Sequence, residues 1–246
     1  MHTAAMRKVI YTCITGGYDV LRQPATVKPD WDYICFTDDA SAGSDGVWQL
    51  RPFKYEGDRR LISRYPKILP HLALADYDAS LYLDANIRIL GDGIYEAAEE
   101  CLAAGALWAG VPHPDRVCIY EEIRRCYLSG HARWRDALKL KKQLQNAGFP
   151  QHYGLLENNV ILRRHNDLRV VAVDEDWWEA YSKGIKRDQL HLMPALLKEG
   201  LKPVNLLPDG RNARNSEALD LVPHAQPFCS AHPRPRLVKA VLKRFL

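Results

Sequence analysis

The sequence predicts an α/β protein in which helices flank a mostly parallel central sheet. Short runs rich in β-branched and aromatic residues alternate with longer segments of helical spacing, which is the pattern of α/β folds. Two of these runs stop abruptly: 9–15 ends at Gly16-Gly17, and 80–83 ends at Asp84. The chain has 246 residues, of which 47% are hydrophobic and 26% charged, enough for one large α/β domain.

The expected elements follow from these patterns in chain order. Strands are expected at 9–15, 33–37, 47–51, 80–83, 107–111 and 159–162. Helices are expected at 59–75, 94–104, 117–128, 132–147 and 187–199. Pro66 and Pro70 are expected to kink or split the first helix, because proline lacks an N–H and clashes with the preceding turn. Asp188 lies near the start of the last expected helix, where a carboxylate interacts favourably with the helix dipole. Pro194 lies inside the same expected helix, where a proline is unfavourable.

The net charge divides the chain into a body and a tail. The formal charge is +4, and the last thirteen residues hold five Lys or Arg and no acid, so the other 233 residues carry −1. A body of this charge argues against nucleic acid as a partner. We therefore expect a domain at 1–233 and a basic tail at 234–246. The apolar residues of 236–246 share one helical stripe, typical either of peripheral membrane contact or of a terminal helix docked on the core.

The remaining bulk features indicate a cytoplasmic protein. No apolar run approaches the roughly 20 residues needed to span a bilayer, and the N-terminus shows no secretory signal. The six cysteines are scattered without a CxxC pair, which argues against a disulfide framework or a zinc site. Any membrane contact through 236–246 is expected on the inner face.

The candidate site centres on the segment SLYLDAN at 80–86. Residues at i and i+2 of a strand point the same way, so Asp84 and Asn86 can face one point. In open α/β sheets ligands bind at the carboxyl ends of the strands. Carboxylate and amide oxygens suit Mg²⁺, which is usually held together with substrate phosphates. We therefore predict a metal–diphosphate site, with an Asx-type turn as the alternative.

The first two strands also end in residues that suit a nucleotide. Thr15-Gly16 follows the first strand, and a glycine there permits close backbone approach to a ligand. The pattern is neither GxGxxG nor a Walker loop, so it supports neither dinucleotide nor P-loop binding. Asp38 follows the second strand and can accept hydrogen bonds from a base or ribose. The alternative for Asp38 is an ordinary turn carboxylate.

Basic residues recur at helical spacing in the segment before the Asp84 strand. Arg60, Arg64, Lys67 and His71 lie three or four residues apart, so they share one helix face. Arginine binds phosphate through two hydrogen bonds and lysine as a point charge, so this face can neutralise a diphosphate. A solvated helix face is the alternative.

Further polar residues near strand ends suit a sugar. Hydroxyl partners together with the flat faces of Trp177-Trp178 are what a sugar site needs, although adjacent tryptophans also arise as one core and one surface residue. The candidates for sugar or acceptor binding are His113, Arg116, Glu157, Asn158 and Gln189.

Three residues complete the predicted site: Asp188 and Arg187 as catalytic residues, and His232 as a metal ligand. Asp188, beside Arg187, is a candidate general base or a positioner of the transferred group. His232 is a candidate third metal ligand, because imidazole can join carboxylates in binding Mn²⁺. A solvent-exposed loop histidine is the alternative for His232.

Taken together these segments resemble nucleotide-sugar glycosyltransferases of the GT-A fold. More narrowly, the chain resembles a glycosyltransferase-like family of bacteria and plants that was first catalogued as a domain of unknown function. Its plant members include seed-mucilage proteins of the TOD/MUCI type. The resemblance covers roughly 11–190 and rests on these segments in this order: YTCITGGYD, WDYICFTDD, RxxSRYPKILPH, YLDANIRI, HPDRVCIYEE, LLENNVILRRHN and RDQL.

The resemblance implies a single-domain GT-A-like fold and a function. The chain is expected to move a sugar from a nucleoside-diphosphate sugar to a hydroxyl of a saccharide or glycolipid acceptor, in cell-surface polysaccharide or glycolipid synthesis. Asp84-Ala85-Asn86 stands where that fold carries its DxD metal motif, which implies Mn²⁺ or Mg²⁺. Asn86 replaces the second aspartate, and the lost charge weakens a metal site. Asp38 is expected near the base, and Asp188 near the reacting sugar.

Three other functions compete with this one. A metal-dependent nucleotidyltransferase shares the sheet and the phosphate site, but TGGYDVLRQP fits its glycine-rich loop poorly. Hydrolysis of a lipid amide, described for one plant relative, lacks support because the sequence has no nucleophile elbow and no zinc-type histidine cluster. A non-catalytic nucleotide-sugar-binding protein is motivated by Asn86.

Overall fold

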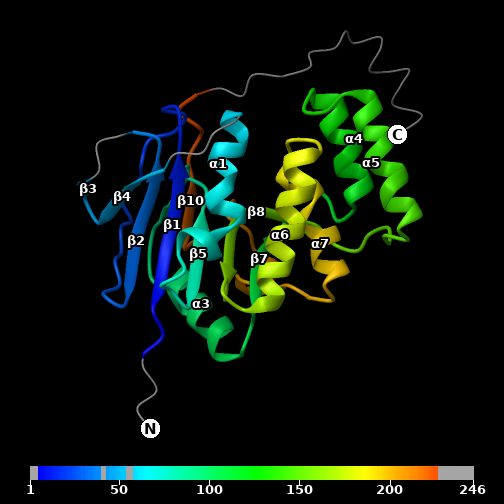
Figure 1. The fold of residues 1–246 in the computed structure, drawn as a ribbon. Coiled ribbons are helices and arrows are strands. Elements are labelled where there is room, and N and C mark those ends of the chain that lie inside the picture. Colours follow the sequence, from blue (N-terminus) through cyan, green and yellow to red (C-terminus); the bar gives the residue numbers. More distant parts are fainter. Residues whose placement is uncertain (1–4, 40–42, 54–57, 227–246) are drawn as a thin grey trace.

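The computed structural model describes residues 5–39, 43–53 and 58–226 and shows a mixed eight-stranded sheet flanked by helices (Figure 1). The strand order is β3-β4-β2-β1-β5-β8-β7-β9. Six strands run in one direction: β1 (Lys8–Ile14), β2 (Trp31–Thr37), β4 (Trp48–Pro52), β5 (Ala79–Leu83), β7 (Trp108–Pro112) and β9 (Val204–Asn205). β3 (Gly43–Asp45) and β8 (Leu156–Arg163) run the opposite way. The carboxyl ends of β1, β2, β5 and β7 therefore meet the amino end of β8 at one edge.

Strand alternation produces two cores, one on each face of the sheet. Val9 and Tyr11 of β1 pack in one core, and Ile10 packs in the other. The first core is covered by α1 (Arg59–Ile68), α6 (Leu168–Lys183) and α7 (Leu192–Lys198). The second is covered by α3 (Gly93–Ala103) and by the small antiparallel sheet of β6 (Ile87–Ile89) and β10 (Leu219–Leu221). Helices α4 (Ile119–Ser129) and α5 (Trp134–Asn146) lie together at one end of the molecule (Figure 1).

The expected elements are confirmed within a few residues, with one exception in the helices, at 187–199. The helix expected at 59–75 is split at a proline, as the sequence predicted: α1 ends at Ile68, and α2 (Pro70–Ala73) begins after Leu69. Leu69 has φ −115° and ψ 57°, outside the helical region, because the ring of Pro70 disfavours helical backbone in the residue before it. Pro66 is accommodated inside α1.

The helix expected at 187–199 is wrong as a continuous element. A 3₁₀ turn (Asp188–Leu190) is separated from α7 by His191, so Asp188 lies in a tight turn outside the α-helix. Pro194 is the third residue of α7, in the first turn, where a missing N–H costs little. Helix α6 and strands β3, β6, β9 and β10 were not expected.

Two sequence-based predictions lie outside the described residues. These are His232 as a metal ligand and the basic tail at 234–246, with its membrane-contact segment 236–246. Within the residues that the model describes, no helix has the length and apolar character needed to cross a bilayer.

Gly184, which follows α6 and leads toward Arg187 and Asp188, is expected to tolerate no side chain. A Cβ there would lie 2.6 Å from the Ala180 carbonyl oxygen and 3.0 Å from the His191 ring. We expect Gly184→Ala to lower the free energy of unfolding by about 1–3 kcal/mol, because the backbone must shift. Urea titration measures this effect. Gly91→Ala is the control, since its Cβ meets nothing within 4 Å, and equal stability of the two variants would contradict the close contact.

Candidate functional site

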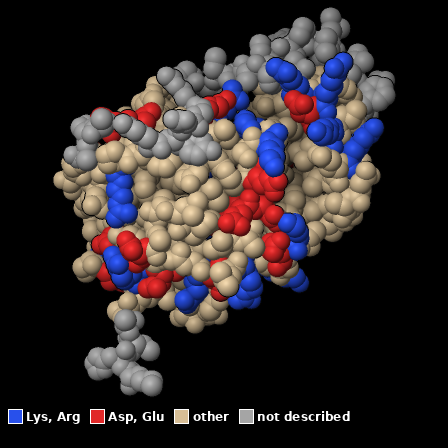
Figure 2. Space-filling model, in the orientation of Figure 1, with Lys and Arg blue, Asp and Glu red and all other residues tan. Residues whose placement is uncertain are grey.

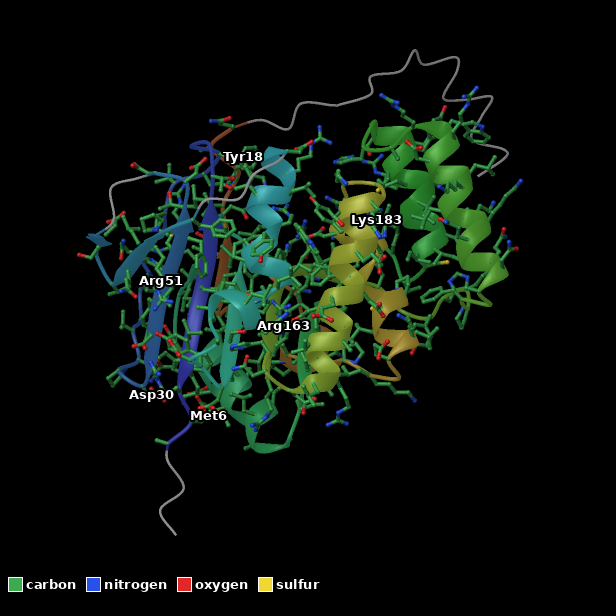
Figure 3. The ribbon with its side chains drawn as sticks, viewed as in Figure 1. Met6, Tyr18, Asp30, Arg51, Arg163 and Lys183 are labelled. Carbon is green, nitrogen blue, oxygen red and sulfur yellow. The ribbon has the colours of Figure 1, made fainter. Side chains whose placement is uncertain are left out.

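A cleft of about 990 Å³ opens at the edge where β1 and β5 end and β8 begins. This volume lies at the upper end of the usual range for small-molecule sites. Tyr18, one of its lining residues, lies at the upper end of β1 in Figure 3. The cleft brings together most of the residues that the sequence nominated: Thr15, Gly16, Arg60, Arg64, Lys67, Asp84, Asn86, Glu157, Arg187, Asp188 and Gln189.

The centre of the cleft is a lysine placed between two carboxylates. Lys67, from the last turn of α1, is 1% exposed. Its Nζ lies 2.8 Å from Asp188 Oδ2 and 3.2 Å from Asp84 Oδ1. The Tyr82 hydroxyl donates to the same Asp84 oxygen at 2.8 Å, and Arg64 Nε lies 3.4 Å from Asp188 Oδ2. We call Asp84, Lys67 and Asp188 the lysine bridge.

The lysine bridge gives Asp188 a strongly acidic carboxyl. Burial raises its pKa, but Lys67, Arg64 and Arg187 outweigh the burial and hold the pKa well below its usual value. A carboxylate that is so weakly basic and already hydrogen-bonded to an ammonium is a poor acceptor for a substrate proton. The arrangement suits the positioning role that the sequence left open for Asp188 and not the role of a general base.

A fully buried network behind the cleft holds Lys67 in place. The Lys67 carbonyl is in the last turn of α1, where carbonyls lack helical partners. It accepts hydrogen bonds from the Tyr11 hydroxyl at 3.3 Å and from the Arg163 guanidinium at 2.5 Å. Arg163 in turn pairs with Asp174 of α6 at 2.7 Å, and both side chains are fully buried. Figure 3 shows Arg163 deep between the sheet and the helices.

The first strand ends in a turn that Asp38 shapes. Gly16 and Gly17 have φ near +60°, a conformation that glycine adopts without strain. Both oxygens of Asp38 accept from the Gly16 N–H, at 2.8 and 3.0 Å. Asp38 therefore stabilises the Gly16 turn through these hydrogen bonds and does not line the cleft.

Asn86 joins the cleft floor to a distant segment of the chain. Its Nδ2 donates to the Val222 carbonyl, and its own carbonyl accepts from the Val222 N–H, both at 2.9 Å. These bonds extend the pairing of β6 with β10 and bring 222–226 across the cleft, where His224 lies 2.8 Å from Asp19.

Three predicted sugar-binding residues do not line the cleft. His113 and Arg116 lie in a second cluster around Glu122, whose carboxylate is 2.6 Å from Arg116 Nε and 3.4 Å from Arg187 Nε. Asn158 is 1% exposed, has φ 61°, and lies where the pairing of β7 with β8 shifts register. These three residues lie behind the residues that line the cleft, and we assign them a structural role.

The two tryptophans do not form a sugar platform. Trp177 is fully buried, and its Nε1 donates to the Asp188 carbonyl at 3.0 Å. Trp178 packs on Tyr65 of α1. The sequence analysis missed several lining residues that lie in loops or turns without a recognisable pattern: Tyr18, Asp19, His131, Lys186, Arg214 and His224.

The described residues alone do not form the divalent-cation centre that the sequence predicted, and the expected third ligand, His232, lies outside them. Among them no group of three or more His, Cys, Asp or Glu side chains could hold a metal ion. Asp84 Oδ1 already accepts hydrogen bonds from Lys67 Nζ and the Tyr82 hydroxyl, and Asn86 carries no negative charge. A divalent ion about 5 Å from the Lys67 ammonium would meet a repulsion of about 7 kcal/mol at an effective dielectric constant of 20. Mn²⁺ or Mg²⁺ at this site stays a prediction that these contacts disfavour.

Comparisons with known proteins show a likeness to solved structures but no family. No protein-family model matches the chain, and no curated protein matches it. Among solved structures, the apo structure of the WbbM bifunctional glycosyltransferase is similar over 83% of this chain, with 10% sequence identity and a TM-score of 0.48. The chain spans 39% of that protein's length. This likeness is too low to assign a function or a site.

Proposed function

We propose that the chain is a glycosyltransferase that moves a sugar from a nucleoside-diphosphate sugar to an acceptor hydroxyl. The observation that carries the proposal is the convergence, in one cleft at the carboxyl ends of the strands, of the Gly16 turn, the lysine bridge and the basic side chains of α1. Ligands of open α/β sheets bind at this edge. A cationic group there suits a diphosphate, and neighbouring carboxylate and amide groups suit sugar hydroxyls.

The sheet order suggests how the donor lies. The nucleoside fits at the turn after β1, the diphosphate near Lys67 and Arg64, and the sugar toward Asp188 and Gln189. In the reaction the bond between the anomeric carbon and the diphosphate oxygen breaks, and its electron pair leaves with the diphosphate. The acceptor hydroxyl oxygen forms the new bond and releases its proton. Lys67 and Arg64 would stabilise the charge that grows on the leaving diphosphate.

The acceptor is proposed to be a saccharide or a glycolipid in the synthesis of a cell-surface polymer. This class follows from the family that the sequence resembles.

The proposal is tested by a screen of UDP-, GDP- and CMP-sugars with the purified full-length chain. Thermal shift measures binding, and product analysis measures turnover with and without Mn²⁺. Release of the nucleoside mono- or diphosphate together with a glycosylated acceptor or free sugar supports a glycosyltransferase. Release of pyrophosphate indicates a nucleotidyltransferase. Saturable binding without turnover indicates a non-catalytic binding protein, and binding of none of these donors contradicts the proposal.

A further inference from the structure

The cleft carries more fixed positive than negative charge. Its described lining residues include six Lys or Arg side chains and four Asp or Glu side chains, an excess of two positive charges. The diphosphate of a nucleotide sugar carries two negative charges at neutral pH. The side chains alone therefore balance such a donor, and a divalent cation would leave the complex with two surplus positive charges.

Each carboxylate of the cleft already has a basic partner. Asp84 and Asp188 share Lys67, and Glu157 lies 2.5 Å from Arg214 Nη1. Asp19 lies 2.8 Å from His224 Nδ1. A cation entering the cleft would therefore bind a carboxylate beside a basic group that already neutralises it.

The surplus positive charge lies at the end of the cleft formed by α1 and α6. Tyr181 of α6 joins the two, since its hydroxyl donates to the Arg60 carbonyl at 3.1 Å and its carbonyl accepts from Lys186 Nζ at 3.0 Å. No described carboxylate lies within 4 Å of the Arg60 or Lys186 cation. Arg187 has only Glu122, at 3.4 Å. Figure 2 shows acidic side chains over α6 and basic side chains above them, toward the end that holds α4 and α5.

We propose that this cleft binds the diphosphate of its donor without a divalent cation, with Lys67 in the cation position at Asp84 and Arg60, Lys186 and Arg187 supplying the surplus charge. The inference rests on the proposed function and specifies how the same site neutralises its substrate. Lys67 fits the role because it is buried, fixed by two carboxylates, and directed to the point where the strand end presents Asp84. A preorganised ammonium can stabilise a leaving diphosphate as a metal ion does.

The first test uses calorimetry with inorganic diphosphate in the presence of EDTA. We expect saturable one-to-one binding, and a loss of affinity of at least tenfold in the double variant Arg60→Gln/Lys186→Gln. Lys183→Gln is the matched control, because Lys183 is exposed on the neighbouring turn of α6, pairs with Glu179 and does not line the cleft. Binding that appears only with Mn²⁺, no binding at all, or equal losses in the control would overturn the inference.

The second test uses Mn²⁺ alone. We expect that Mn²⁺ does not bind to the unmodified chain and does bind to Lys67→Ala. In this variant the ammonium is gone, and the two carboxylates that contacted it, Asp84 and Asp188, are close enough together to share one ion. Circular dichroism checks that this variant folds. If it does not fold, the result with the unmodified chain stands by itself: Mn²⁺ binding that Asp84→Asn removes would overturn the inference, and absence of binding supports it.

These outcomes separate the inference from the proposed function. Turnover of a sugar nucleotide that requires Mn²⁺ would refute the cation-free site and leave the glycosyltransferase intact. Diphosphate binding in EDTA without turnover of any sugar nucleotide would support the site and refute glycosyl transfer.

Discussion

Asp188→Asn is expected to slow sugar transfer by about 100-fold to 1,000-fold while leaving donor binding nearly unchanged. In the unmodified chain the Asp188 carboxylate holds Lys67 Nζ at 2.8 Å and Arg64 Nε at 3.4 Å. The amide keeps the shape but removes the charge, so Arg64 loses its carboxylate and Lys67 keeps only Asp84, at 3.2 Å, and both are positioned less well for the transition state. Steady-state kinetics should show a fall in kcat with little change in KM.

The pH dependence distinguishes positioning from proton transfer. The pKa of Asp188 is held well below its usual value, so the carboxylate stays ionised in the folded protein through the mildly acidic range. Its contribution to stability is present above the unfolded-state pKa and is lost as the pH falls through the lower folded-state pKa. We therefore expect no acidic limb of the rate profile from Asp188, and a weaker loss of stability in acid for Asp188→Asn. Asp76→Asn is the exposed control. An unchanged kcat in Asp188→Asn would remove this residue from the mechanism.

The strand ends of the site were predictable, because they depend on local patterns. The apolar runs before Gly16 and Asp84 end in residues that cannot continue a buried strand, and parallel strands bring such ends to one edge. Arg60, Arg64 and Lys67 were nominated from helical spacing, and all three line the cleft.

The lysine bridge was not predictable, because it depends on tertiary contacts. Helical spacing places Lys67 beside Arg64, but only the packing of α1 against β1 buries its ammonium between two carboxylates. The sequence therefore suggested a metal at Asp84 and gave no sign that the Lys67 ammonium lies 3.2 Å from this carboxylate.

Helix α6 was missed for a related reason. Asp174 interrupts its apolar pattern and reads as a surface residue, yet it is fully buried because Arg163 neutralises it. An analysis of hydrophobic periodicity counts every acidic residue as exposed. It cannot show that Asp174 pairs with Arg163, which lies eleven residues earlier, on β8. The same helix carries Trp177, whose role is to hold the Asp188 carbonyl and not to contact a sugar.

Breaking the ion pair between Arg163 and Asp174 is expected to destabilise the fold more than any surface change. Both side chains are fully buried and lie 2.7 Å apart. We expect Arg163→Met and Asp174→Leu each to lower the free energy of unfolding by about 3–5 kcal/mol, because each leaves a buried charged group without its nearest partner. In Arg163→Met, Asp174 keeps only His71 Nδ1, at 3.9 Å. Arg163→Met also removes a hydrogen bond to the Lys67 carbonyl, so donor binding should weaken in the fraction that stays folded.

The double variant Arg163→Met/Asp174→Leu separates burial of charge from loss of packing. With both charges gone, apolar side chains of similar volume recover much of the stability, so the double variant should be more stable than either single one. Urea titration of the four proteins gives the coupling energy. The surface pair Lys198–Asp176 of the same region is the control, and Lys198→Met should cost less than about 1 kcal/mol. A loss of that small size in Arg163→Met would contradict a main contribution of this ion pair to the stability of the fold.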